Sequence, residues 1–223
     1  MARRSDPCPA LVLFGSGPPN DREADVSLPR RIVVAISGAS GAIYGVRAVE
    51  TIREDRSVEL HLIISAGAKA TIEYETDRSV ADVAKLADVV HEEKDLAATI
   101  ASGSFQTHGM LVAPCSIRTL SAIAIALNDN LIVRAADVHL KERRKLVLMV
   151  RETPLNATHL RLMHEATLAG AVILPPVPGF YQRPKTLMDL VDHSVGKALD
   201  QLGIEHSLFE RWSGIRPSST RAE

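Results

Sequence analysis

The sequence predicts a single α/β domain built on a doubly wound parallel sheet. Short apolar runs alternate with helical segments from Arg31 to Leu202, as expected when crossover helices join parallel strands. Most of these runs are apolar throughout rather than at every second residue, which is typical of strands covered on both faces. The stretch 38–45 follows the first run, with a tight turn of small residues and then the start of a helix, at the strand end where such sheets bind ligands.

The predicted strands are short, apolar and rich in Val, Ile and Leu, and turn residues follow most of them. They are Ile32–Ser37, Glu59–Ile64, a weak Asp88–His91, Met110–Ala113, Leu146–Val150 and Ala171–Leu174. The segments between them have the longer apolar spacing of helices. These are Ala42–Arg53, Ala66–Tyr74, Val80–Leu86, Arg118–Ala126, Leu131–Glu142, Ala157–Ala169 and Met188–Leu202.

The two ends of the chain differ from this pattern. Residues 1–28 mix Arg3-Arg4, the short apolar run 11–14 and Pro18-Pro19 with polar residues. That apolar run is too short for the core of a secretory signal. We therefore expect a flexible N-terminal extension, or an arm lying on a neighbouring subunit, before the folded domain 29–212. Residues 213–223 are expected to form a loose C-terminal tail.

Composition excludes several functional classes. The formal net charge of −1 argues against binding driven by charge to nucleic acid or to a membrane surface. No apolar run approaches the length of about 20 residues that spans a bilayer. Cys8 and Cys115 form no disulfide framework, so a reducing, cytoplasmic compartment is expected. The eight histidines show no metal-ligand spacing, and an Asp-rich motif for a magnesium-bound diphosphate is missing, so no metal is predicted.

The turn after the first strand is the strongest indication of a ligand. Gly38 lets the backbone approach a ligand closely, and the helix that follows presents free N–H groups to an anion. Ser40 adds a hydroxyl that either caps this helix or contacts a phosphate. An ordinary strand-to-helix turn without a ligand is the alternative. The spacing differs from G-x-G-x-x-G, which argues against a nicotinamide cofactor.

Other strand ends carry groups that also suit an anion, and parallel strands bring these ends to one edge of the sheet. Ser65 follows the second strand, and residues 114–119 follow the fourth. The Arg151-Glu152 pair and the proline-rich loop 175–181 follow the last two. Together these ends predict a site for a phosphate-bearing ligand.

Several of these residues have a structural alternative. Ser116 and Thr119 either cap a helix or bind phosphate oxygens. Arg151 suits phosphate and Glu152 suits proton transfer, unless the two form a structural ion pair. Cys115 is expected to be a packed thiol rather than a nucleophile. Arg134 and Lys141, seven residues apart, share a helix face.

Several blocks in order resemble the flavin prenyltransferases of the UbiX type, from about Arg31 to Trp212. The matching blocks are residues 38–45 (GASGAIYG), 75–77 (ETD), 114–120 (PCSIRTL), 134–138 (RAADV), 140–144 (LKERR), 150–154 (VRETP) and 175–181 (PPVPGFY).

The resemblance implies a flavodoxin-like flavoprotein domain over 29–212 and a homo-oligomer built from trimers, commonly a dodecamer. It also implies the reaction: a dimethylallyl group passes from dimethylallyl phosphate to N5 and C6 of reduced FMN. The product, prenylated FMN, serves UbiD-type decarboxylases of ubiquinone biosynthesis and aromatic acid decarboxylation. The diphosphate is left open as a second donor.

The resemblance also implies roles for individual residues, with sites at subunit interfaces. Ser40, Glu75, Lys141 and Glu152 are the expected catalytic residues. FMN is expected to bind at Gly38, Ala39, Ser40, Ser65, Ser116, Ile117, Arg118, Thr119 and Arg151. The prenyl phosphate is expected at Arg134, Lys141, Tyr181, Lys197 and Trp212.

Two positions depart from the family pattern. Lys197 stands where relatives often have arginine, and Arg118 stands where lysine is frequent; both keep the charge. A flavin-dependent cysteine decarboxylase of the phosphopantothenoylcysteine kind is an alternative, but its Pro-x-Met-Asn motif does not occur here. A flavin carrier without catalysis is another. Glu75, Lys141, Glu152 and Tyr181 argue against it, because flavin storage needs no prenyl-phosphate site.

Overall fold

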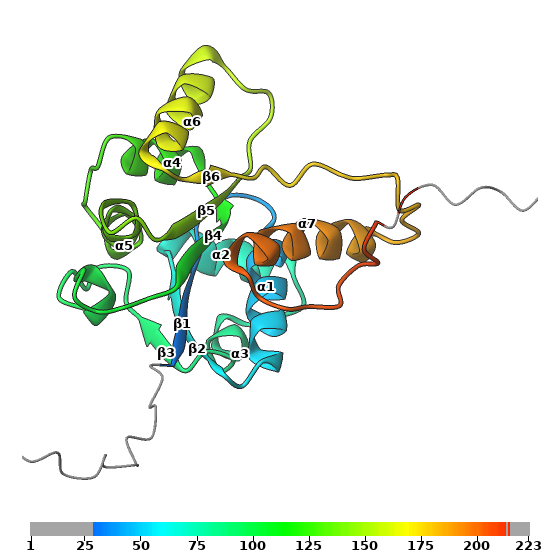
Figure 1. Ribbon diagram of the computed structural model, residues 1–223, viewed down its shortest axis with the longest axis horizontal. Helices are drawn as coiled ribbons and strands as arrows, with labels where there is room; N and C mark the ends of the chain where they lie inside the picture. Colours follow the sequence, from blue (N-terminus) through cyan, green and yellow to red (C-terminus); the bar gives the residue numbers. More distant parts are fainter. Residues whose placement is uncertain (1–28, 213, 215–223) are drawn as a thin grey trace, which may run out of the picture.

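Six strands form one parallel sheet in the order β3-β2-β1-β4-β5-β6, which confirms the predicted doubly wound sheet. The computed structural model describes residues 29–212 and 214 (Figure 1). Without the three-residue edge strand β3, the other five strands follow the flavodoxin order 2-1-3-4-5. The strands are β1 (Arg30–Ile36), β2 (Val58–Ile64), β3 (Val89–His91), β4 (Gly109–Cys115), β5 (Lys145–Val150) and β6 (Val172–Ile173).

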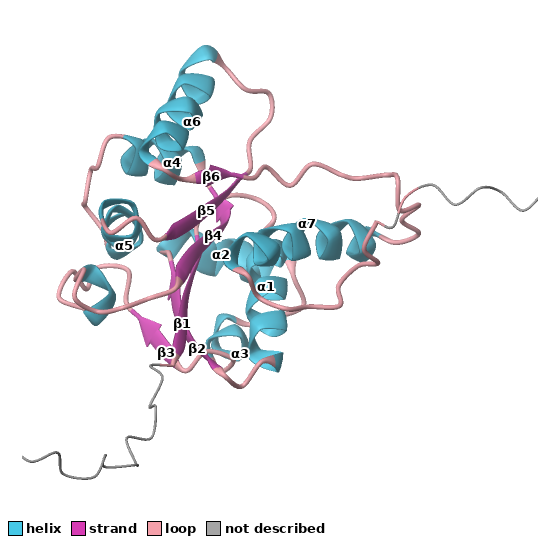
Figure 2. Ribbon diagram, viewed as in Figure 1, coloured by secondary structure: helices cyan, strands magenta, loops and turns pink. Residues whose placement is uncertain are grey.

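Helices cover both faces of the sheet, as the ribbon coloured by secondary structure shows (Figure 2). Helices α1 (Ala42–Glu54), α2 (Ala66–Glu75), α3 (Val80–Ala84) and α7 (Leu187–Leu202) pack with one face. The other face is covered by α4 (Ile117–Ala124), α5 (Leu131–Lys141), α6 (Ala157–Ala169) and the 3₁₀ turn Thr99–Ala101.

The central strand β1 shows why the apolar runs are continuous. Ile32, Val34 and Ile36 pack into the core on the side of α1 and α7. Val33 and Ala35 point the opposite way and join the core under α4 and α5. All five are fully buried, so both faces of the strand need apolar side chains.

Each predicted helix and strand is present, with small differences at the ends. Helix α4 begins at Ile117 because Ser116 is its N-cap, and α3 ends at Ala84, earlier than predicted. The 3₁₀ turn Thr99–Ala101 was not predicted. The expected N-terminal extension and nearly all of the expected tail lie outside the described residues. Within the described part of the chain, no helix combines the length and apolar character needed to cross a bilayer.

The segment between β6 and α7 leaves the body of the domain. It runs outward to the start of α7, and the chain after α7 returns alongside that helix (Figure 1). Several large apolar side chains on these segments and at the start of α7 are exposed: Phe180 is 70% exposed, Leu187 76% and Trp212 62%. Exposed apolar side chains gathered in this way are typical of a surface that another protein covers.

His139 on α5 is fully buried and uncharged. Its Nδ1–H donates to Ala135 O at 2.7 Å, and Thr107 Oγ1 donates to its Nε2 at 2.9 Å. Burial lowers the pKa of His139 from 6.5 to about 4. The unfolded chain therefore takes up this proton first as the pH falls.

We expect the stabilisation from neutral His139 to be complete above about pH 6.5 and to be lost as the pH falls towards 4. Between pH 7.5 and 4.5 the free energy of unfolding should fall by about 2–3 kcal/mol on this account. Urea unfolding of the wild type and of His139→Gln at both pH values measures the effect. Other groups titrate in both proteins, so equal losses in the two would contradict the prediction.

Candidate functional site

The carboxyl ends of β1 and β4 lie side by side and are tied together by one buried hydroxyl. Ser37 Oγ donates to Pro114 O and accepts from Ser116 N, both at 2.8 Å. This places the start of α4 next to the turn that follows β1. Strands on either side of such a point run to helices on opposite faces, which leaves a crevice between them. Ser37 was not among the predicted site residues, although its place after a buried apolar run was a usable signal.

Helix α4 presents its N-terminus to this crevice. Ser116 Oγ accepts from Thr119 N at 3.2 Å and lies 3.0 Å from Thr119 Oγ1, so Ser116 does cap the helix. The other N–H groups of a first helical turn have no partner inside the helix and attract anions. Ile117 packs its side chain against the core, so its contribution to a ligand would come from its backbone.

Helix α2 begins beside the same crevice. Ser65 caps it by accepting from Ala68 N at 3.1 Å. Glu93, from the loop after β3, also accepts from Ala66 N at 2.8 Å. This carboxylate thus satisfies one of the free N–H groups at the N-terminus of α2. Glu93 was missed in the sequence because one acidic residue in a charged loop gives no signal of its own.

Two glycines allow the turn after β1 to touch the start of α2. A Cβ atom built on Gly38 would lie 3.0 Å from Gly67 Cα and 3.1 Å from Gly67 C. Both neighbours are backbone atoms, which cannot rotate away. The closeness of these two turns therefore depends on glycine at both positions.

We expect Gly38→Ala to force the turn and α2 apart, and to weaken FMN binding at least about tenfold with a loss of about 1–3 kcal/mol in the free energy of unfolding. Titration with FMN and urea unfolding measure the two effects. Ala70→Ser, a small substitution at an exposed position of α2 that does not line the cavity, serves as the control. Unchanged FMN affinity in Gly38→Ala would show that this approach is not needed for the ligand.

These elements enclose a cavity of about 430 Å³. Its lining contains five of the residues predicted to bind FMN: Gly38, Ser65, Ser116, Arg118 and Thr119. The Arg118 side chain is 89% exposed and lies 3.9 Å from Asp129, so its guanidinium is available at the mouth. The cavity also has unpredicted lining residues, among them Gly67, Glu93, Lys94, Asn130 and Ile132.

Ser40 does not cap the helix that follows it. The N-cap of α1 is Gly41, in the left-handed region at φ 98°, and no side chain caps the helix from that position. Ser40 is exposed, and its hydroxyl has no hydrogen-bond partner among the residues that the structure describes. Of the two roles weighed for Ser40, helix capping is therefore wrong, and contact with a ligand remains. Ala39, half-buried, lies beside it in the same turn.

Glu75 reaches the same turn from the far end of α2. Its Oε2 accepts hydrogen bonds from Gly41 N at 2.7 Å and from Ala42 N at 3.1 Å. The carboxylate thus takes the place of a cap on α1 and is held next to residues 38–41. Glu75 is therefore fixed at the switch point of the sheet.

Arg151 and Glu152 lie at the end of β5 but do not pair with each other in the described part of the chain. Arg151 N donates to Cys115 O at 3.1 Å, which holds this end beside β4. Burial raises the pKa of Tyr44, and the charge of Arg151 acts against that rise, so the guanidinium lies near the phenol. Glu152 accepts from Thr153 N at 3.0 Å. The structural ion pair weighed from the sequence is not formed.

Arg134 and Lys141 share a face of α5, as predicted, and both lie against residues 101–103. Arg134 donates to Ala101 O at 3.1 Å and to Asp137 at 3.0 Å, while Lys141 pairs with Glu142 beside Gly103. Asn130, the N-cap of α5, lines the cavity. Lys141 stands at the opposite end of that helix, about 15 Å away along its axis. One chain therefore does not bring Lys141 to its own cavity.

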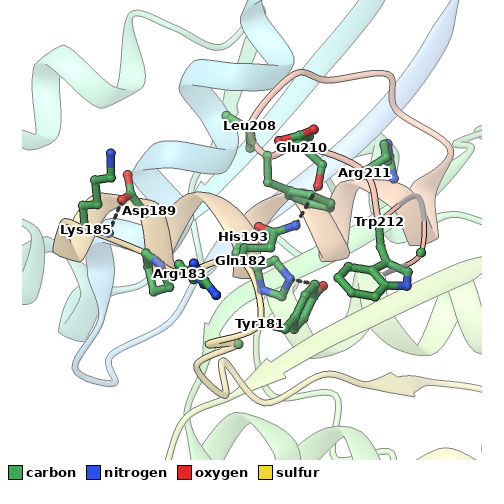
Figure 3. Close-up of a pocket in the computed structure, with 14 residues that line it drawn as sticks. Tyr181, Gln182, Arg183, Lys185, Asp189, His193, Leu208, Glu210, Arg211 and Trp212 are labelled. Atoms are coloured by element: carbon green, nitrogen blue, oxygen red, sulfur yellow. Dashed lines mark hydrogen bonds between the residues drawn. The ribbon is translucent and has the colours of Figure 1, made fainter. Parts of the chain in front are cut away.

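Tyr181, Lys197 and Trp212 form a third group around α7. Figure 3 shows Tyr181 and Trp212 beside this helix, and Lys197 is one of the residues of the helix itself. The rings of Tyr181 and Trp212 meet edge to face, with centroids 5.8 Å apart. Tyr181 Oη is hydrogen-bonded to His193 Nε2 at 2.8 Å. Burial and the charge of Lys197 together lower the pKa of His193, so Lys197 lies close to this pair. His193 was not predicted, because a single histidine on a helix gives no signal.

A second cavity, of about 520 Å³, lies beside this group. Tyr181, His193 and Trp212 line it together with Arg183, Lys185 and Arg211. It has no lining residue in common with the cavity at the strand ends. The predicted site residues thus fall into separate groups within one chain. Among the described residues, no cluster of His, Cys, Asp and Glu side chains could hold a metal ion.

Comparison with known proteins gives the family. Residues 21–196 match the Flavoprotein family. The flavin prenyltransferase UbiX of Thauera aromatica is 59% identical over 184 residues, which are 82% of this chain and 94% of the relative. The crystal structure of AnUbiX (PadA1) in complex with FMN and dimethylallyl pyrophosphate is 52% identical with a TM-score of 0.82, covering 84% of this chain and 99% of that one.

A second solved structure is similar to nearly the same degree. It is a dodecameric FMN-dependent UbiX-like decarboxylase from Escherichia coli O157:H7, 49% identical with a TM-score of 0.81, covering 82% of this chain and all of that one. The sequence is about half identical to these relatives over nearly their whole length, and the fold agrees with the two solved structures over the same range. The chain therefore belongs to the UbiX family of flavin prenyltransferases.

Proposed function

We propose that this chain transfers a dimethylallyl group from dimethylallyl phosphate to N5 and C6 of reduced FMN, giving prenylated FMN. The observation that supports this proposal most strongly is the cavity at the carboxyl ends of β1, β2 and β4, where five residues predicted to bind flavin come together. The bound FMN and dimethylallyl pyrophosphate of the AnUbiX complex support the pairing of these two ligands.

The cavity fits the flavin mononucleotide. The N-terminus of α4, the hydroxyls of Ser116 and Thr119 and the exposed guanidinium of Arg118 suit a phosphate. Gly38 and Gly67 place no side chain at this point, so a ligand can approach the backbone closely there. Ala39, Ser40, Ser65, Ile117 and Arg151 complete the proposed set. Reduced FMN supplies the nucleophilic nitrogen and carbon of the reaction.

Proton handling is assigned to groups at the same turn. Ser40 is part of the turn 38–41, Glu75 is hydrogen-bonded to Gly41 N in the same turn, and Glu152 follows shortly after the end of β5. Carboxylates and hydroxyls placed beside a reacting ring can remove or return a proton as the new bonds form. Fixed positions are essential for this role, and the two hydrogen bonds to Glu75 supply one.

The departing phosphate is assigned to cations and one phenol. Arg134, Lys141 and Lys197 carry positive charge, Tyr181 offers a hydroxyl, and Trp212 covers the Tyr181 ring. Charge that develops on a leaving phosphate can be stabilised by fixed donors of this kind. We propose that the reaction needs no metal for this reason.

The complete site forms between copies of the chain. Lys141 lies far from the cavity of its own subunit, and the segments around α7 expose Phe180, Leu187 and Trp212. A trimer-based assembly, a dodecamer as in the Escherichia coli relative, would cover these side chains and bring the groups together. The product would then pass to a UbiD-type decarboxylase.

Mass spectrometry of the flavin tests the proposal. The protein is incubated without oxygen with reduced FMN and dimethylallyl phosphate, in the presence of a chelator. A flavin heavier by one dimethylallyl unit is expected, and the chelator should not reduce its yield. A flavin recovered unmodified would instead indicate a carrier.

We expect Tyr181→Phe to raise the KM for dimethylallyl phosphate about tenfold, because one hydroxyl donor to the phosphate is lost. FMN affinity should be nearly unchanged, since the two cavities share no lining residue. Steady-state kinetics and FMN titration separate the two effects. Lost FMN binding would show that the 175–181 loop contributes to the flavin site instead.

A further inference from the structure

His193 is held tightly beside Tyr181 by its surroundings. Its ring packs against Tyr181, with centroids 5.5 Å apart, and on Phe209, with centroids 5.0 Å apart. A Cβ atom on Gly179 would lie 2.9 Å from His193 Cε1, so the loop backbone closes against the ring as well. The hydrogen bond from Nε2 to Tyr181 Oη at 2.8 Å is therefore made by a ring with little freedom to turn (Figure 3).

We propose that His193 is a positioning residue, which holds Tyr181 and directs its hydroxyl proton towards the phosphate of the prenyl donor. The inference rests on the proposed function, which assigns Tyr181 to that phosphate. His193 itself does not touch the substrate in this assignment.

The direction of the hydrogen bond between Tyr181 Oη and His193 Nε2 decides where the phenol proton can point. A phenol that binds an anion must donate its single proton to that anion. Its oxygen is then free to accept, and a neutral imidazole with the proton on Nε2 is the matching donor. Burial and the charge of Lys197 lower the pKa of His193, which favours the neutral ring. Lys197, near the same ring, would add charge to the same phosphate.

The experiment is a double-mutant cycle between these two residues. His193→Phe keeps an aromatic ring and removes the donor, while His193→Gln keeps an N–H group at nearly the same reach. We expect His193→Phe to raise the KM for dimethylallyl phosphate about fivefold to tenfold with a smaller change in kcat, and His193→Gln to restore most of the loss. FMN affinity should stay the same in both.

The Tyr181→Phe background distinguishes positioning from general damage. There, His193→Phe should add no more than about a twofold effect, because the partner hydroxyl is already absent. His164→Phe is the matched control, since His164 is exposed on α6 and has no hydrogen-bond partner in the described part of the chain. An unchanged KM in His193→Phe, or the same rise in both backgrounds, would overturn the inference. A wild type that makes no prenylated flavin would overturn the proposed function itself.

Discussion

Glu75→Ala is expected to bind FMN and yet lose prenyl transfer by about 100-fold or more, the size of effect typical of a removed proton-transfer group. The carboxylate is held against residues 38–41 by Gly41 N and Ala42 N, next to the turn that lines the flavin cavity. It does not itself line that cavity, so flavin affinity should fall little. Single-turnover measurement of prenylated FMN, beside FMN titration, checks both parts.

A matched variant separates the chemistry of Glu75 from its structural contact. The amide oxygen of Glu75→Gln can still accept from the two N–H groups of α1, so the turn should keep its shape. The amide can neither carry the charge nor take up a proton, and its rate should resemble that of Glu75→Ala. If Glu75→Gln retained nearly full activity, Glu75 would be a helix cap and not a catalytic residue.

The fold could be predicted because the sheet imposes one requirement on each strand. Strands such as β1 must be apolar on both faces, and that requirement is visible in the sequence as an unbroken run. Element ends were less certain, since they depend on single side-chain contacts. Ser116 moves the start of α4 to Ile117 by capping it, and a hydroxyl at that place could also have served a ligand.

The candidate site was predictable where strand ends determine it. Gly38, Ser65 and Ser116 follow three neighbouring strands, so topology alone brings them to one cavity. Contacts between distant segments left no local signal. Glu93 on the start of α2 and His193 on Tyr181 depend on how loops fold back, which residue spacing does not reveal.

A mixture of two inactive variants is expected to recover activity, because Lys141 and the flavin cavity of one chain lie at opposite ends of α5. Lys141→Ala should lose most prenyl transfer through loss of a cation at the leaving phosphate. The Lys141→Ala variant keeps the flavin cavity and Glu75. The Glu75→Ala variant keeps Lys141. Coexpression of the two would combine an intact half from each variant at some of the shared sites.

The expected recovery of activity follows from how many sites receive intact residues from both subunits. If each site takes Glu75 from one subunit and Lys141 from another, random assembly leaves about a quarter of the sites with both groups intact. About a quarter of the wild-type rate should therefore return, whereas variants mixed without exchange of subunits should stay inactive. Chains that carry both substitutions, coexpressed with the wild type, control for expression. If exchange is complete and no activity returns, Glu75 and Lys141 do not meet across an interface, and the shared site is wrong.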